Sequence, residues 1–147
     1  EWLAEEEKEH SSKAGRIYGR TGGVSEAVRE TVRRLNPRRL IDVRAEQADG
    51  TKSCRELLQR LQEGKITANY LEGMGCEGGC CGGPKVLIPP EDGKCYVNMY
   101  GKASPYETPL DNPNVRELLQ RLGFNSVESL LRDSIFTRHF EELAVKF

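Results

Sequence analysis

The sequence has no long apolar run, no large excess of either charge and few hydrophobic residues. No stretch approaches the roughly 20 apolar residues that a membrane helix needs. No charged start followed by an apolar middle indicates a signal peptide. Twenty-two basic residues face 23 acidic ones, and the net charge of −1 argues against nucleic acid or an anionic membrane as the main target. These absences favour a cytoplasmic protein.

The composition is polar for a chain of this length. Hydrophobic residues make up 37% of the 147 positions, against about 45–50% in an ordinary globular chain, and charged residues reach 31%, against about 25%. The length allows one compact domain and excludes two large ones. Since apolar material is scarce, we expect part of the surface to meet a partner.

Histidine is scarce and cysteine is odd in number. The chain has two histidines and five cysteines, the latter at Cys54, Cys76, Cys80, Cys81 and Cys95. A disulfide scaffold fits this pattern poorly, because the cytosol keeps thiols reduced and the chain is long enough to fold without staples. Metal or redox chemistry is the better interpretation.

The middle of the chain predicts a βαβ unit. Apolar residues over 40–45 indicate a strand, leucines at helical spacing indicate a helix over 53–63, and residues 67–72 can form a second strand. Such strands pair in parallel, so the loop after the second strand leaves the carboxyl end of the sheet, where open α/β sheets bind ligands.

The remaining elements are mostly helical. Helices are expected over residues 1–10, 24–35, 114–122, 127–131 and 135–147, and a further strand over 94–100. The fold class is therefore α/β, with a small, mostly parallel sheet, flanking helices and a helical C-terminal tail. A charged N-terminal helix, an α/β lobe and that tail are expected over residues 1–13, 14–103 and 104–147.

A glycine-rich loop, residues 72–84, carries three of the cysteines and six of the 15 glycines. Cys76 and Cys80, four residues apart at the start of a short helical turn, can direct two sulfurs to the same side. Clustered thiolates suit iron–sulfur chemistry, with zinc as the next possibility. Zinc is the weaker interpretation, since His10 and His139 lie far off in sequence.

The loop also resembles a motif of a known family. Its residues Glu72, Met74, Cys76, Gly79, Cys80 and Gly83 match every fixed position of E-x-M-x-C-x-x-G-C-x-x-G, the third cluster-binding motif of the iron-only (FeFe) hydrogenases. Residues 21–27 resemble the T-G-G-V-x-E-A segment that precedes this motif in the same family. Residues 111–113 and the helix after them look like the small-subunit segment that wraps the catalytic domain.

The resemblance implies a specific cofactor. Cys76 would bind a 4Fe–4S cubane, and Cys80 would bridge that cubane to a diiron subcluster at which protons are reduced to H2 with ferredoxin-type electron carriers. Met74 would pack its thioether beside the diiron unit. Gly79 would let the backbone approach the cluster. Glu72 would be a hydrogen-bonding carboxylate at the site, although a solvated or capping carboxylate is an equal alternative.

The sequence also departs from that family. The first motif, T-S-C-C-P-x-W, and the second, M-P-C-x-x-K-x-x-E, do not occur, so two of the four cluster cysteines, the proton-relay thiol and the cyanide-contacting lysine are lacking. The resemblance therefore implies a C-terminal fragment, inactive alone, whose partner is the N-terminal half of the same catalytic domain. The alternatives are a fragment of a hydrogenase-related iron–sulfur scaffold or sensor without H2 chemistry, and a local zinc or thiol site.

The other cysteines and one helix start have simpler interpretations. Cys54 lies on the apolar face of its helix and Cys95 in a strand, so both are expected to pack, while the role of Cys81 stays open. Thr21 is the expected N-cap of the helix that follows, and the N–H groups there could bind an anion such as phosphate, although most helix starts bind nothing.

A basic cluster, residues 33–39, lacks the interleaved aromatic residues typical of nucleic-acid binding. A solvated helix end is the better interpretation of these arginines.

Overall fold

The structure, a computed structural model, describes residues 10–38 and 40–134. The chain divides into two compact units, residues 1–112 and 113–147. Nearly all of the expected N-terminal helix and the whole of the helix expected over 135–147 lie outside the described residues.

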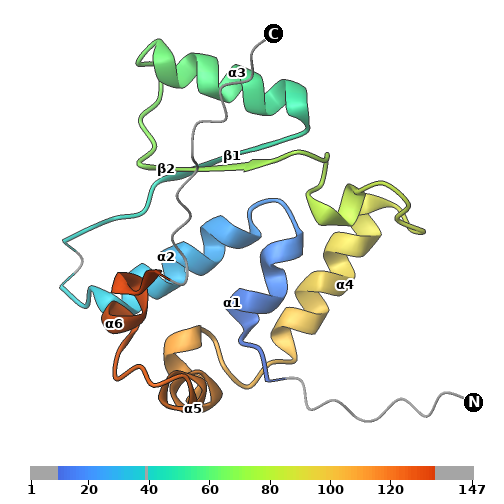
Figure 1. The fold of residues 1–147 in the computed structure, drawn as a ribbon. Helices are drawn as coiled ribbons and strands as arrows, with labels where there is room; N and C mark the ends of the chain where they lie inside the picture. Colours follow the sequence, from blue (N-terminus) through green and yellow to red (C-terminus); the bar gives the residue numbers. More distant parts are fainter. Residues whose placement is uncertain (1–9, 39, 135–147) are drawn as a thin grey trace, which may run out of the picture. The chain divides into compact units, whose positions relative to one another are not determined.

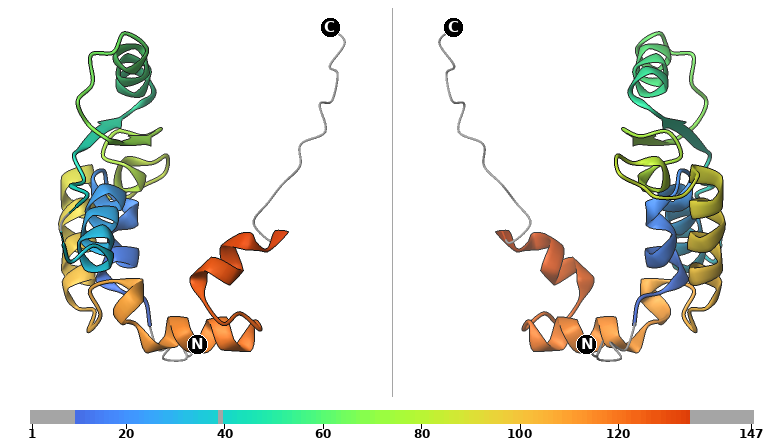
Figure 2. Two further views of the ribbon diagram at one scale, coloured as in Figure 1. Left: turned by 90° about the vertical axis from the view of Figure 1, so that its left-hand side faces the viewer. Right: turned by 90° about the vertical axis from the view of Figure 1, so that its right-hand side faces the viewer.

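The first unit contains the predicted βαβ arrangement. Strand β1 (Ala45–Asp49) is followed by helix α3 (Thr51–Gln62) and strand β2 (Tyr70–Met74). The two strands pair in parallel, with Ala45 opposite Tyr70 and Asp49 opposite Met74. Figures 1 and 2 show this sheet between α3 and helix α2 (Gly23–Leu35). The α/β class and the small parallel sheet are confirmed.

The first strand begins five residues later than predicted. Residues 40–44 are not in the sheet, because asparagine side chains bind their backbone groups. Nδ2 of Asn36 donates to the Ile41 carbonyl at 3.2 Å, and Nδ2 of Asn69 donates to the Asp42 carbonyl at 2.8 Å. Leu40 is 80% exposed. An apolar run predicted this strand, but pairing with β2 decides where it lies.

Three helices of the first unit pack together: α1 (Lys13–Arg16), α2 and α4 (Pro90–Lys102). A 3-10 turn over Ile17–Gly19 joins the first two. The strand predicted over 94–100 is wrong, since these residues lie within α4. Pro90 at its first position is a helix-start signal, and the following residues Glu91 and Asp92 favour the positive end of the helix dipole.

Helix α4 packs through small residues. Gly93 and Gly101, eight residues apart on one face, are both buried. A Cβ at Gly101 would lie 2.6 Å from Cγ2 of Ile17, and one at Gly93 would lie 3.3 Å from Cβ of Cys81. The helix can therefore approach its neighbours closely.

The apolar core of the described residues is small, as the composition suggests. Its buried members are Ala14, Ile17, Ala27, Ala48, Leu57 and Cys81. Helical spacing predicts one buried stripe along α2 that includes Ala27 and Leu35; Ala27 is buried, but Leu35 is 66% exposed. Most of these buried side chains are small, so polar contacts carry much of the cohesion between elements.

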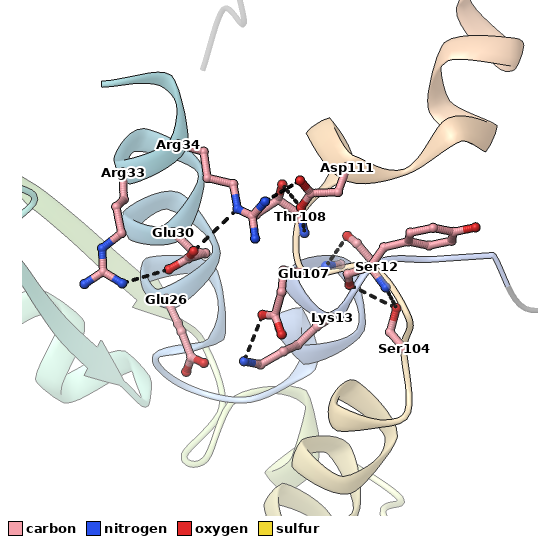
Figure 3. A network of polar contacts seen from close by, with 12 residues as sticks. Ser12, Lys13, Glu26, Glu30, Arg33, Arg34, Ser104, Glu107, Thr108 and Asp111 are labelled. Atoms are coloured by element: carbon pink, nitrogen blue, oxygen red, sulfur yellow. Dashed lines mark hydrogen bonds and ion pairs between the residues drawn. The ribbon is translucent and has the colours of Figure 1, made fainter. Parts of the chain in front are cut away.

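One set of polar contacts joins residues 104–112 to α1 (Figure 3). The backbone N of Lys13 donates to the Tyr106 carbonyl at 2.7 Å, and that of Ala14 donates to the Glu107 carbonyl at 3.0 Å. The first N–H groups of a helix have no partner within it, so this segment satisfies them. Residues 104–112 therefore pack with the first unit, although the sequence pattern groups them with the tail.

The same segment is tied to α2. Thr108 is fully buried, and its hydroxyl donates to Oδ2 of Asp111 at 2.8 Å. Asp111 forms an ion pair with Arg34 of α2, which also pairs with Glu30 (Figure 3). Arg34, one of the arginines in the basic cluster, is therefore neutralised by acidic residues of its own unit.

The second unit contains two described helices, as the sequence predicts. Helix α5 (Pro113–Arg121) ends before Gly123, whose φ of +82° follows the usual pattern of a glycine after a helix. Helix α6 (Val127–Arg132) begins with a cap in which the Ser126 hydroxyl accepts from the Ser129 N–H. Within the part of the chain that the structure describes, no helix is long and apolar enough to cross a membrane.

Adjacent leucines on α3 test the packing of this helix. Leu57 is 6% exposed and Leu58 is 58% exposed. We expect Leu57→Ala to lower the free energy of unfolding by about 2–4 kcal/mol, because it opens a cavity in a small core. Leu58→Ala should change it by less than about 0.5 kcal/mol. Urea denaturation of both variants measures the difference, and equal effects would contradict the packing described.

Candidate metal centre

The cysteine loop begins where β2 ends, at the carboxyl edge of the sheet (Figure 1). It consists of residues 75–79 and a 3-10 turn, η2 (Cys80–Gly82). The βαβ unit predicts this position. Two residues of the motif, Glu72 and Met74, lie on the strand itself, so the sheet fixes where the loop starts.

Glu72 joins this strand to the start of α2. Its carboxylate is 5% exposed and accepts three hydrogen bonds: Oε1 from the Gly22 N–H at 2.7 Å, and Oε2 from the Ser25 N–H at 2.7 Å and the Ser25 hydroxyl at 2.5 Å. Gly22 is the N-cap of α2 and Ser25 is its third residue. A capping box normally satisfies these two N–H groups with side chains of the helix itself. Here one carboxylate from a distant strand does both.

This contact corrects the expected role of Thr21 and bears on anion binding. Gly22 is the N-cap in place of Thr21, and its φ of +80° is a conformation that glycine adopts without steric cost. Two of the N–H groups that an external phosphate could use at this helix start, those of Gly22 and Ser25, are bound by Glu72, and the Gly23 N–H donates to the Arg20 carbonyl. The structure shows Glu72 as a capping carboxylate, and its expected role at the cluster site stays a prediction. The sequence pattern does not point to Ser25, because its hydroxyl donates to a carboxylate that is distant in sequence.

Gly79 is where the loop contacts the chain before α2. Its φ is +74°, and it forms an isolated antiparallel bridge with Arg20. A Cβ at this position would lie 2.8 Å from the Thr21 nitrogen and 3.0 Å from the Arg20 carbonyl carbon. The motif therefore needs glycine here for both conformation and space.

The three loop thiols differ in exposure. Cys80 is exposed and Cys76 is half-buried, while Cys81 is buried and its thiol donates to the Gly19 carbonyl at 3.5 Å. Burial raises the pKa of Cys81, and the neighbouring Cys80 raises it further. Cys81 is thus a packed, protonated thiol, and Cys76 and Cys80 are the accessible pair.

The two remaining cysteines lie outside the loop. Cys54, on α3, is half-buried and its thiol donates to the Met74 carbonyl at 3.3 Å, which agrees with the expected packing role. Cys95 was expected to pack in a strand, but it lies on α4 and is exposed.

Apolar groups lie next to the accessible thiols. The Met74 sulfur would be 2.5 Å from a Cβ at Gly79, so this side chain packs directly over the glycine. Cys80 borders an open hollow of about 350 Å³, lined mainly by apolar side chains. Its lining includes Val86, Ile88, Tyr96 and Val97. One side of the exposed thiol is therefore poor in polar groups.

The donor set fits half of a cluster site. Within residues 10–38 and 40–134, no group of three or more His, Cys, Asp or Glu side chains is arranged to hold a metal ion. Cys76 and Cys80 are two soft thiolate donors on one short loop, which suits iron–sulfur ligation but does not complete four ligands.

The fold and this loop define a class of protein: a small α/β unit that presents a pair of thiols at the carboxyl edge of its sheet. The sequence matches the family described as iron only hydrogenase large subunit, C-terminal domain, over residues 2–84, more than half of the chain. The chain belongs to this family, as the loop motif indicates. Membership of this family indicates oxidoreductase chemistry. A comparison with curated proteins found no match.

Replacing the Glu72 carboxylate tests the link between β2 and α2. We expect Glu72→Gln to lower the free energy of unfolding by about 2 kcal/mol, because an amide has one acceptor oxygen and no charge to offer the helix start. Glu77→Gln, an exposed carboxylate in the same loop, should change it by less than about 0.5 kcal/mol. Denaturant unfolding compares them, and a Glu72 variant as stable as the Glu77 variant would refute the cap.

Two loop glycines provide a matched pair. Gly79→Ala should lower the free energy of unfolding by at least about 2 kcal/mol. An alanine at this positive φ is strained, and its Cβ would also press on the backbone at residues 20 and 21. Gly75→Ala should be tolerated, because nothing lies within 4 Å of a Cβ there. Thermal unfolding of both variants measures this, and a stable Gly79→Ala would show that the loop does not need the close approach.

Proposed function

We propose that this chain supplies two thiolate ligands to the active-site cluster of an iron-only hydrogenase. Cys76 would bind a 4Fe–4S cubane and Cys80 would bridge it to a diiron subcluster. The observation that carries the proposal is that the family match includes a loop whose accessible thiols are these two. When bound, such a cluster supplies electron transfer and the reduction of protons to H2, with electrons from ferredoxin-type carriers.

The residues around the thiols have supporting roles. Glu72 and Gly79 hold the loop against the start of α2 through buried contacts. Met74, packed over Gly79, adds a soft apolar side chain. The apolar hollow beside Cys80 would limit water on one side of a bound cluster.

The other ligands must come from sequence outside these 147 residues, because the two motifs that carry them in the family do not occur here. We propose the N-terminal half of the same catalytic domain as the partner, and we expect the chain alone to be inactive. Five free cysteines suit a reducing compartment, so the cytoplasm is the proposed location. Neither nucleic acid nor a membrane is proposed as a partner.

One observation favours a second candidate. The relay cysteine and the cyanide-contacting lysine of the family are not in this sequence. If the N-terminal half lacks them too, the parent is an iron–sulfur scaffold or sensor without H2 chemistry.

The test is anaerobic production of the chain together with the polypeptide that carries the two other motifs and with the hydrogenase maturation proteins. We expect H2 evolution and the infrared bands of iron-bound CO and cyanide. Cys76→Ser and Cys80→Ser should abolish both, and Cys81→Ser, the matched neighbour, should leave cluster assembly intact. A 4Fe–4S signal with no H2 and no such bands would favour the scaffold. Stoichiometric zinc in the anaerobically purified chain would contradict both.

A further inference from the structure

Gly78, midway between the two accessible thiols, is bound on both sides of its backbone. Its N–H donates to Oδ2 of Asp49 at 2.9 Å, and its carbonyl accepts from the Thr21 N–H at 3.4 Å. The Thr21 hydroxyl donates to the same Oδ2 at 2.7 Å. Three hydrogen bonds thus form a closed ring through three segments that are distant in sequence. We call Thr21, Asp49 and Gly78 the loop clamp.

The sheet fixes the acidic member of the clamp. Asp49 is the last residue of β1 and lies opposite Met74, the last residue of β2. Its carboxylate is therefore held at the edge of the sheet from which the cysteine loop leaves. The next residue, Gly50, turns the chain away with φ of +75°.

The clamp acts on the most mobile kind of backbone. Gly78 and Gly79 are consecutive glycines with φ of +79° and +74°. Glycine has more conformational freedom to lose than any other residue. Without contacts to hold it, a peptide between two glycines would let the flanking cysteines take many relative positions.

The charge on Asp49 strengthens the clamp. The hydrogen bond from the Thr21 side chain lowers the pKa of Asp49, and the bond from the Gly78 N–H lowers it further. Burial opposes these bonds by less than either of them, and the charge of Lys94 adds a smaller lowering of the pKa. The carboxylate is thus ionised at neutral pH, and charged acceptors form the stronger hydrogen bonds.

We propose that Asp49 and Thr21 are positioning residues for the thiol pair: by clamping the Gly78 peptide, they set the separation and direction of the Cys76 and Cys80 sulfurs, and hence their affinity for a soft metal. Both residues lie outside the E-x-M-x-C motif. That the metal is an iron–sulfur cluster rests on the proposed function, whereas the clamp rests on the contacts above.

The first measurement uses Cd²⁺ as the probe, with the thiolate-to-metal ultraviolet band as the signal, in a chain in which the exposed Cys95 is serine. We expect Thr21→Val and Asp49→Ala to weaken Cd²⁺ binding by about tenfold, a usual effect of losing an outer contact. Thr21→Ser, which keeps the hydroxyl, should restore it. Glu46→Ala removes a β1 carboxylate that pairs with Arg60 on α3, and it is the matched control. It should bind Cd²⁺ as tightly as the chain that carries the Cys95→Ser change alone.

The second measurement needs no metal. The Gly79 N–H donates to the Cys76 carbonyl at 3.1 Å, so its hydrogen exchange reports closure of the loop. It should exchange at least about tenfold faster in Thr21→Val and Asp49→Ala than in Glu46→Ala. Far-ultraviolet circular dichroism and unfolding midpoints would show that each variant is folded.

The outcomes separate the two proposals. If both clamp variants bind Cd²⁺ and exchange like the control, the clamp is refuted. If hydrogen exchange accelerates as expected but the chain with the Cys95→Ser change alone forms no thiolate band with Cd²⁺, the clamp holds the loop without preparing a metal site. That result overturns the positioning role. Failure of H2 evolution in the assembled protein would refute the proposed function. It would not change the interpretation of the Cd²⁺ binding and hydrogen-exchange measurements.

Discussion

The first unit depends on one buried carboxylate. Glu72 comes from the second strand, yet it completes the start of α2, a helix that begins 50 residues earlier at Gly22 and Gly23 and has no capping side chain of its own. A buried carboxylate is stable only when it is well paired, and the N–H groups of a helix start are equally in need of a partner. Each element therefore satisfies the other. The cysteine loop starts three residues after Glu72. The contact between Glu72 and α2 therefore also fixes the position at which this loop begins.

The polar composition is reflected in how the chain holds together. The buried apolar side chains in the described residues are few and mostly small, so they supply limited hydrophobic stabilisation. Backbone and side-chain hydrogen bonds join segments that are distant in sequence. Examples are the bonds from α1 to residues 104–112 and the bond from the cysteine loop to Asp49. Tyr96, Met99 and Leu87 remain exposed on or near α4. The apolar hollow beside Cys80 is lined by Tyr96 and Val97 of the same helix.

Local sequence patterns predict some elements of this fold correctly and misplace others. Helical periodicity located α2, α3, α5 and α6, because an amphipathic pattern and its end signals are local. The first strand was misplaced, because asparagine side chains from elsewhere bind the backbone of residues 40–44. The strand predicted over residues 94–100 is wrong, because these residues belong to α4, which buries glycines rather than large side chains, and hydrophobic periodicity does not detect such a face. The spacing of Cys76 and Cys80 indicates them as candidate ligands, whereas Asp49 lies outside any motif and Ser25 holds the variable position of the T-G-G-V-x-E-A segment.

The sequence alone determined the family, the α/β class, the position of the loop after the second strand and the thiols to consider, because each of these is written in short-range patterns. The tertiary structure decided what the motif residues do. It showed Glu72 as a helix cap, Gly79 as a point of close approach, Cys81 as a buried thiol and Asp49 as a contact of the loop. These roles arise from contacts between segments tens of residues apart. Such contacts depend on how the strands pair and the helices pack, which no local pattern specifies.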